Sequence, residues 1–346
     1  MLRGIVMKVL MMMCFILILP QGAAISRECG IPVSRPAGIF RVDSFEALEE
    51  LGRMVAQQEG EYTGEVWLVC DIEAARPMEP IGSGAHAFSG TFDGKGHVIA
   101  GLTIRGGGDF QGLFGYVGAR GCVKDLTLRG VVSAGTRYTG GIAAYSAGTI
   151  SGCMVEGGYI AGGGGLEYGA ATGGIVGLSC GAVIDCRAID TRVGGLRYVG
   201  GIVGSQCGGR ISGCLSAATV YSWYGGEALA GGVAGGIQTG GLIERCISAG
   251  EVRAAGAAWA GGVVGGVMSG QVKKCISYAE VDGREQGGIA GYASQRAQII
   301  RCGYLGMDKG VGEGRQDGTE QIAADKREAL YEKKIRYRPE KSKAEG

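Results

Sequence analysis

The hydrophobic positions of the chain follow one repeated phrase from about residue 112 to residue 302. The first half of the phrase is a glycine pair, two aliphatic residues and a small residue, as in residues 200–204. Its copies follow one another about every 26 to 33 residues. Seven copies contain a GxxG-like segment that begins at Gly112, Gly141, Gly174, Gly201, Gly232, Gly262 or Gly288.

The second half of the phrase is an aliphatic residue with a cysteine three positions later. The aliphatic residues are Val123, Ile150, Val183, Ile211, Ile243, Val272 and Ile299. Leu126 stands at the later position in the first copy, and the others carry Cys153, Cys186, Cys214, Cys246, Cys275 and Cys302. A third aliphatic position follows in most copies: Val132, Ile160, Val193, Val220, Val252 and Val281.

Short apolar segments between glycine turns, repeated at a fixed period, predict a β-solenoid, because one unit cannot bury its apolar face alone. We expect an all-β parallel β-helix of about seven glycine-rich coils, with three strands per coil and a length of about 35 Å. A helical repeat is excluded because each of the two glycines per phrase would cost about 1 kcal/mol inside a helix.

The segments outside the repeat predict a leader, a cap and a tail. Residues 1–24 have the pattern of a secretory signal: Arg3 and Lys8, an apolar run at residues 9–19, and small residues ending at Ala24. An uncleaved membrane anchor is the alternative, but the apolar run is shorter than the roughly 20 residues that a spanning helix needs. We expect no integral membrane segment after cleavage.

We divide the rest of the chain into an N-terminal cap at residues 25–87, the solenoid at residues 88–305, and a linker, short helix and charged tail at residues 306–346. Asp43 is the predicted N-cap of the capping helix, with Glu46 completing a capping box. Residues 40–42 and 65–71 form predicted strands. The apolar residues of the helix share one face: Phe45, Leu48, Leu51 and Val55.

Composition narrows the class of protein further. The chain has 71 glycines but only 6 prolines and no Gly-x-y period, which excludes collagen. Its hydrophobic fraction of 46% argues against a disordered linker. A net charge of +1 argues against a partner bound through bulk electrostatics, nucleic acid above all.

The cysteines fall into two groups. The six repeat cysteines should stack one strand spacing apart and face inward, so we predict a column of buried free thiols. Cys180 and Cys207 each follow a glycine phrase in successive coils, and their expected spacing suits a disulfide. They are the pair that we expect to bond if any pair does. Cys29, Cys70 and Cys122 have no assignable partner.

The sequence offers little catalytic chemistry. The two histidines, His86 and His97, lie in no HExxH motif, and we expect no metal site and no cofactor. An Asp93–His97 catalytic pair is a weaker hypothesis than a turn aspartate that accepts hydrogen bonds from its own backbone. The acidic residues of the coils do not repeat in register, which argues against a polysaccharide lyase or hydrolase.

Aromatic residues are the strongest candidates for ligand binding. Tyr138, Tyr198 and Trp259 occupy one repeat position and predict a column along one edge, while Trp223 and Tyr224 lie in a longer loop. Such a column could stack against sugar rings or contact a protein, and packing between adjacent coils is the alternative.

These motifs resemble the GLUG-motif family, which occurs in exported bacterial proteins and beside IgA-specific metallopeptidases. Residues 112–115 (GLFG) match the naming motif, and residues 88–104 (FSGTFDGKGHVIAGLTI) are similar to the opening coil of that family. The resemblance covers about residues 38–305. It implies a β-solenoid with a surface or adhesive role.

Our main hypothesis is therefore a secreted or surface-attached, non-catalytic bacterial scaffold for interaction or adhesion. Its partner would be a protein or glycan of a host or of the cell envelope. Two alternatives remain open: a carbohydrate-binding module that uses the aromatic column, and a polysaccharide-active β-helix enzyme. The sequence leaves the oligomeric state open.

Overall fold

The structure is a computed structural model that describes residues 38–163, 169–224, 226–256, 258–314 and 318–321. The predicted signal at residues 1–24 and the chain beyond residue 321 lie outside the described residues.

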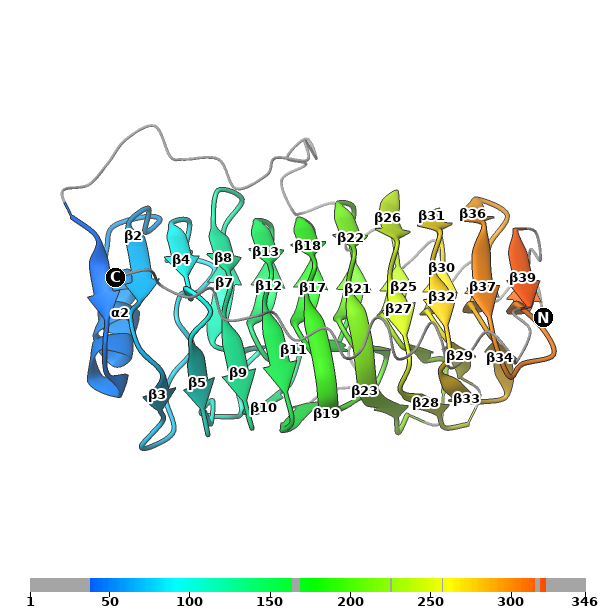
Figure 1. The fold of residues 1–346 in the computed structure, drawn as a ribbon, viewed down its shortest axis with the longest axis horizontal. Coiled ribbons are helices and arrows are strands. Elements are labelled where there is room, and N and C mark those ends of the chain that lie inside the picture. Colours follow the sequence, from blue (N-terminus) through cyan, green and yellow to red (C-terminus); the bar gives the residue numbers. More distant parts are fainter. Residues whose placement is uncertain (1–37, 164–168, 225, 257, 315–317, 322–346) are drawn as a thin grey trace, which may run out of the picture.

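The chain winds into a parallel β-solenoid of about nine turns (Figure 1). The all-β solenoid predicted from the repeat is confirmed. The expectation of three strands per coil is wrong, because four sheets run along the rod. The missed strand is the segment immediately before each glycine pair, which is too short to show an apolar alternation of its own.

Sheets I and II form the outer wall of the rod. Sheet I contains β1 (Phe40–Val42), β2 (Glu65–Leu68), β4 (Thr91–Asp93), β8 (Cys122–Lys124), β13 (Thr149–Ser151), β18 (Ala182–Ile184), β22 (Arg210–Ser212), β26 (Gly241–Glu244), β31 (Gly270–Lys273) and β36 (Ala297–Ile300). Sheet II contains β3 (Ile72–Glu73), β5 (Val98–Ala100), β9 (Thr127–Arg129), β10 (Val132–Gly135), β14 (Met154–Glu156), β15 (Tyr159–Gly162), β19 (Arg187–Gly195), β23 (Leu215–Ser222), β27 (Ile247–Ser248), β28 (Glu251–Ala254), β32 (Ile276–Ser277), β33 (Glu280–Asp282), β37 (Cys302–Tyr304) and β39 (Thr319–Gln321).

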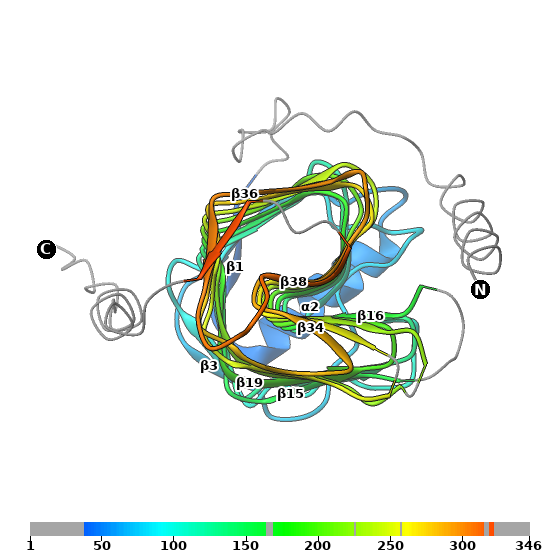
Figure 2. The same ribbon diagram turned by 90° about the vertical axis from the view of Figure 1, so that its right-hand side faces the viewer.

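Sheets III and IV turn inward from this wall, as the end-on view shows around β16, β34 and β38 (Figure 2). Sheet III contains β6 (Phe110–Gln111), β11 (Tyr138–Gly140), β16 (Ala171–Gly173), β20 (Tyr198–Gly200), β24 (Leu229–Gly231), β29 (Trp259–Gly261) and β34 (Glu285–Gly287). Sheet IV contains β7 (Phe114–Val117), β12 (Ala143–Ser146), β17 (Val176–Ser179), β21 (Val203–Gln206), β25 (Ala234–Ile237), β30 (Val264–Val267), β35 (Ala290–Ala293) and β38 (Val311–Gly314).

Each glycine of the phrase meets a different backbone obstacle. A Cβ on Gly200 would lie 2.0 Å from the carbonyl oxygen of Val203, inside the turn that joins sheets III and IV. A Cβ on Gly201 would lie 2.3 Å from the oxygen of Gly232 in the next coil. A Cβ on Gly204 would lie 2.5 Å from the nitrogen of Thr172 in sheet III of the preceding coil. These three positions therefore require glycine because the backbones approach one another closely, and not because φ is positive.

The repeat aliphatic residues form the core as predicted. The residues of the second half pair in register along sheet I and are buried, from Val123 through Ile211 to Ile299. Each stacked residue covers the one below it, so the core is continuous along the rod.

Val132 is an exception to the predicted core. It pairs with Tyr159, so Ser133 and not Val132 stacks on Ile160. Successive side chains of a strand point to opposite faces, and this shift of one residue leaves Val132 40% exposed.

The corner before each repeat cysteine, and before Leu126 in the first copy, has one fixed backbone conformation. In seven successive coils this residue has a positive φ near 50° to 70°, where Asp and Gly are tolerated better than most residues. The seven corner residues are Asp125, Gly152, Asp185, Gly213, Arg245, Lys274 and Arg301.

The six repeat cysteines that follow the corner are buried and free, as predicted. Their thiols contact main-chain carbonyls of the preceding coil, as Cys214 Sγ does at 3.6 Å from the oxygen of Val183. They serve as small apolar residues with a weak donor.

The helix α2 (Phe45–Gln57) lies across the N-terminal end of the rod (Figures 1 and 2). Its predicted apolar face is buried. The predicted cap residue Asp43 is wrong, because Ser44 has the extended N-cap conformation and its Oγ accepts the N–H of Ala47 at 3.2 Å. The helix begins one residue later than Asp43 would require.

The sheets extend beyond the predicted solenoid boundaries at both ends. β1, β2 and β3 join sheets I and II before residue 88, where the sequence suggested a separate cap with strands at residues 40–42 and 65–71. After residue 305, where a linker was expected, β38 pairs with β35 and β39 pairs with β37. These added strands explain why there are about nine turns and not seven.

The glycine turn gives a test of the fold. We expect Gly200→Ala to lower the free energy of unfolding by about 3 kcal/mol or more, because the added methyl group would overlap the Val203 carbonyl. Urea unfolding followed by circular dichroism measures the loss. Gly84→Ala is the matched control, since a Cβ there meets no atom within 4 Å. Equal stability of the two variants would contradict this account of the turn.

Candidate functional site

The predicted aromatic column exists as a register position of sheet III. Tyr138, Tyr198 and Trp259 share one register position of sheet III. Ala171 and Leu229 occupy the same position in the coils between them. The repeat position alone was enough to place them together.

The side chains of the aromatic column mostly contact neighbouring residues of the solenoid. Tyr198 is only 7% exposed and belongs to a small apolar cluster. The Trp259 ring lies 5.8 Å from that of Tyr292, and its indole N–H donates to Glu313 Oε2 at 2.6 Å. The geometry favours coverage of neighbouring coils, and ligand binding by the column stays a prediction.

A second aromatic group lies on the outer face of sheet II, which forms the lower edge in Figure 2 around β15 and β19. We call Tyr159, Tyr221 and Trp223 the aromatic platform. Trp223 is 40% exposed and Tyr159 is 39% exposed. Of the predicted ligand-binding residues, only Trp223 belongs to it; its neighbour Tyr224 is half-buried and lies against Gly226.

Sequence reasoning missed Tyr159 and Tyr221. Each is adjacent to a repeat aliphatic residue, Ile160 or Val220, and adjacent residues of a strand point to opposite faces. That alternation could have identified both as outward residues, but only the register brings them together. Burial, and then a hydrogen bond between the side chains of Tyr159 and Tyr221, raise the pKa of Tyr221.

The predicted neighbourhood of Cys180 and Cys207 is present. Both are half-buried free thiols at the ends of successive strands of sheet IV. Tyr145 and Cys180 hydrogen-bond, Cys180 hydrogen-bonds to Cys207, and Cys207 Sγ lies 3.5 Å from Thr239 Oγ1. Whether the two thiols oxidise to a disulfide stays a prediction.

The hydrogen bond from Cys180 lowers the pKa of Cys207 to about 6, although burial acts in the opposite direction. The same bond, with burial, raises the pKa of Cys180. The bond therefore favours the thiolate on Cys207 over that on Cys180, and the thiolate is the reactive form of a cysteine.

We expect Cys180→Ala to raise the pKa of Cys207 from about 6 toward the ordinary cysteine value of about 8.5, because the variant removes the thiol donor. The pH dependence of alkylation of Cys207 in the reduced protein, followed by mass spectrometry, measures the shift. Cys70→Ala removes another half-buried thiol and should change nothing. An identical midpoint in the Cys180→Ala variant would refute the role of Cys180.

Asp93 and His97 have separate partners within the described residues. Asp93 Oδ1 accepts the N–H of Lys95 at 2.9 Å, the backbone bond expected of a turn aspartate. Its Oδ2 lies 3.0 Å from the ammonium groups of Lys95 and Lys124, while His97 Nδ1 lies 3.1 Å from Asp71 Oδ1. The contacts of Asp93 lock the turn, and His97 pairs with Asp71, so the predicted Asp93–His97 pair does not form.

The environment of Asp93 predicts a loss of stability in acid. Burial raises the pKa of Asp93, but the hydrogen bonds from Lys95 and Lys124 and the charge of Lys124 outweigh it, so the pKa lies below its usual value. The carboxylate therefore stabilises the fold above its unfolded pKa of about 3.9, and this contribution is lost as pH falls through the lower folded pKa.

We expect Asp93→Asn to lower the free energy of unfolding by about 1–2 kcal/mol at pH 7 and by much less at about pH 2. Denaturant unfolding at the two pH values measures the difference. Glu50→Gln breaks only an exposed pair with Arg53 and should cost under about 0.5 kcal/mol. A pH-independent cost at Asp93 would show that the charge is not responsible.

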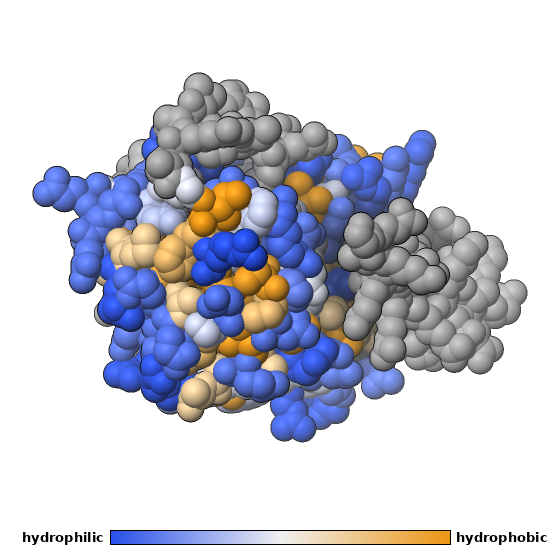
Figure 3. All heavy atoms as spheres, turned by 60° about the vertical axis from the view of Figure 1, so that its left-hand side comes forward, coloured by the Kyte–Doolittle hydropathy of each residue, from blue (hydrophilic) through white to orange (hydrophobic). Residues whose placement is uncertain are grey.

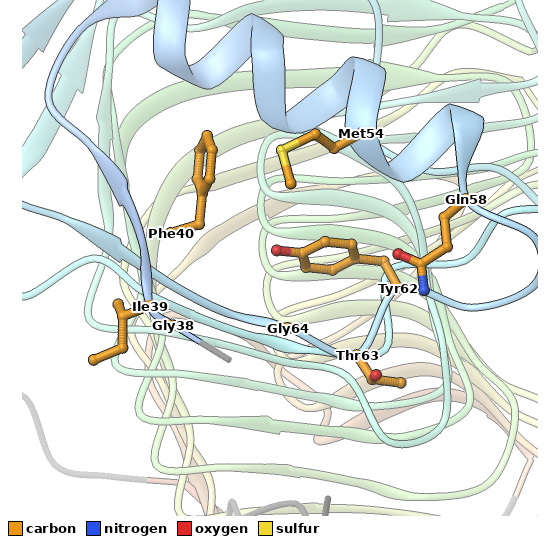
Figure 4. A pocket seen from close by; sticks show the side chains of 8 residues that line it. All are labelled: Gly38, Ile39, Phe40, Met54, Gln58, Tyr62, Thr63 and Gly64. Atoms are coloured by element: carbon orange, nitrogen blue, oxygen red, sulfur yellow. The ribbon is translucent and has the colours of Figure 1, made fainter. Parts of the chain in front are cut away.

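A pocket of about 380 Å³ opens beside α2 at the N-terminal end (Figure 4). Apolar side chains gather among polar ones on this end of the surface (Figure 3). The pocket is lined by Gly38, Ile39, Phe40, Met54, Gln58, Tyr62, Thr63 and Gly64. Tyr62 is the only ionisable side chain in this lining, so the pocket offers no acid–base pair.

Two further properties of the described residues concern metal ligands and membrane-spanning helices. No group of three or more His, Cys, Asp or Glu side chains in this part of the chain is placed to hold a metal ion. None of the helices described is long and apolar enough to span a membrane.

Comparison with known proteins relates the chain to larger proteins with similar segments. No protein-family model matches the chain. It is 31% identical over 130 residues to halomucin of Haloquadratum walsbyi, which is 34% of this chain and 1% of halomucin. It is 37% identical over 82 residues to a "putative Gly-rich membrane protein" of Evansella cellulosilytica, which is 22% of this chain and 10% of that protein.

The chain thus spans a small part of the length of these relatives. A solved structure with a similar fold covers far more of it. The "crystal structure of a putative immunoglobulin A1 protease" from Bacteroides ovatus superposes with a TM-score of 0.58 over 85% of this chain and 86% of that chain. The sequence identity is 20%, so the likeness concerns the solenoid fold.

Proposed function

We propose that the chain is an exported, non-catalytic β-solenoid that serves as an interaction scaffold outside the cell or on its surface. The observation that carries the proposal is the aromatic platform, in which Tyr159 and Trp223 are exposed on the sheet while Tyr198 of the aromatic column is buried. Exposed aromatic side chains that gather on one face are typical of interaction sites.

Two features support export. Residues 1–24 have the pattern of a secretory signal. One similar protein is named halomucin, and another is named a "putative Gly-rich membrane protein".

The non-catalytic part of the proposal depends on the placement of the ionisable groups. Buried Asp93 is neutralised by two lysines, and the pocket beside α2 has no carboxylate or histidine in its lining. A lyase or hydrolase would require a pair of acid and base groups facing one substrate position.

A carbohydrate-binding module is the second candidate. It is favoured by one observation, the open aromatic platform on sheet II, because flat aromatic faces stack against sugar rings. The site differs from the aromatic column that the sequence suggested.

Export is tested by fractionating bacteria that express the full chain with a C-terminal epitope tag. We expect the protein outside the cytoplasm with a new N-terminus after Ala24, and we expect a variant without residues 1–24 to remain in the cytoplasm. Mass spectrometry of the N-terminus and immunoblots of the fractions give the result. Cytoplasmic retention of the full chain would contradict the proposal.

A further inference from the structure

Exposed apolar side chains of the described residues are concentrated on one face. Five large apolar residues are exposed: Ile39, Val132, Tyr159, Trp223 and Ile300. Three of them, Val132, Tyr159 and Trp223, lie on the outer face of sheet II. Single exposed apolar residues need no explanation, whereas a group on one regular sheet does.

The rings of this face are held by contacts within the sheet. Val132 and Tyr159 are register partners in adjacent coils. The hydroxyl of Tyr159 hydrogen-bonds with Tyr221, whose ring centre lies 5.2 Å from that of Trp223. The platform is therefore preorganised and would lose little side-chain entropy when a ligand binds.

Glycine provides the floor on which these rings lie. A Cβ on Gly194 would lie 2.3 Å from Trp223 Cζ3 and 2.5 Å from Tyr221 Cζ. A Cβ on Gly163 would lie 3.2 Å from Trp223 Cζ2. Any larger side chain at Gly194 would lift both rings, so the flat arrangement depends on that glycine.

A guanidinium group stands within this face. Arg192 is exposed, pairs in register with Tyr159 and Thr219, and forms no ion pair among the described residues. Other arginines of sheet II differ: Arg129 binds Glu156 at 2.9 Å, and Arg253 pairs with Glu251. Arg192 is thus available for an anionic group of a ligand.

The combination points to one class of ligand. The aromatic faces suit the apolar faces of pyranose rings, and a guanidinium binds a carboxylate with two parallel hydrogen bonds. Coils repeat about every 4.8 Å along the rod, close to the length of one sugar in an extended polymer. We propose that Tyr159, Arg192, Tyr221 and Trp223 bind acidic polysaccharides, that is, polymers of carboxylated pyranoses. This inference rests on the proposed function outside the cell.

The experiment measures binding of the full mature chain to three uronate polymers: polygalacturonate, alginate and hyaluronan. Isothermal titration calorimetry at 0.1 M and 0.5 M NaCl compares the wild type with W223A, Y159A and R192Q. R129Q is the matched control, because Arg129 lies on the same sheet but is already paired with Glu156. Fully methyl-esterified polygalacturonate has the same rings without the charge.

We expect binding to at least one polymer, weakened about tenfold or more by W223A and by R192Q and unchanged by R129Q. The methyl ester should bind at least about tenfold more weakly than the acid. R192Q should also reduce the loss of affinity at high salt, since it removes the screened charge. Thermal unfolding of each variant should stay close to that of the wild type, because these side chains lie on the outer face of the sheet and not in the core.

Three outcomes would overturn the inference: no binding to any of the three polymers, equal binding by W223A and the wild type, or equal affinity for the acid and its methyl ester. These failures are distinct from failure of the proposed function. The fractionation test depends on residues 1–24 and not on the platform, so export can stand when acidic polysaccharide binding does not.

Discussion

The rest of the structure depends on the contact of backbone against backbone between sheets III and IV. The two sheets approach so closely that Gly204 lies against the main chain of the neighbouring sheet, with no room for a Cβ. Gly200 and Gly201 make the turn between the sheets and the passage to the next coil. This geometry explains why the phrase has three glycines in five residues.

This contact separates the structural residues from the variable ones. Inward positions are constrained by stacking, because a substituted side chain would contact the equivalent residues of the coils above and below. Outward positions of sheet II are free to differ from coil to coil, and there the chain varies between Tyr159, Arg192 and Thr219 in one register column. Activity of any kind is therefore expected on the outer wall and at the corners, where a substitution does not disturb the stack.

The cysteines illustrate the same division. Cys214 and its five equivalents are buried in the stack, and their thiols contact carbonyl oxygens of the coil below. Cys180 and Cys207 lie at the edge of sheet IV, where hydrogen bonds between neighbouring coils change the pKa of each thiol. One residue type thus serves packing in one column and has reactive potential in another.

The sequence by itself determined the class of fold, the core columns, the position of the capping helix and the register of Tyr138, Tyr198 and Trp259. A repeat reports residues that must be the same in every coil, and stacking makes those residues the core. Only the tertiary structure decided that there are four sheets, that Val132 faces outward, and that Tyr159, Tyr221 and Trp223 meet on one face. These features depend on contacts between residues at different positions of different coils, and a periodic pattern along one chain contains no signal for them.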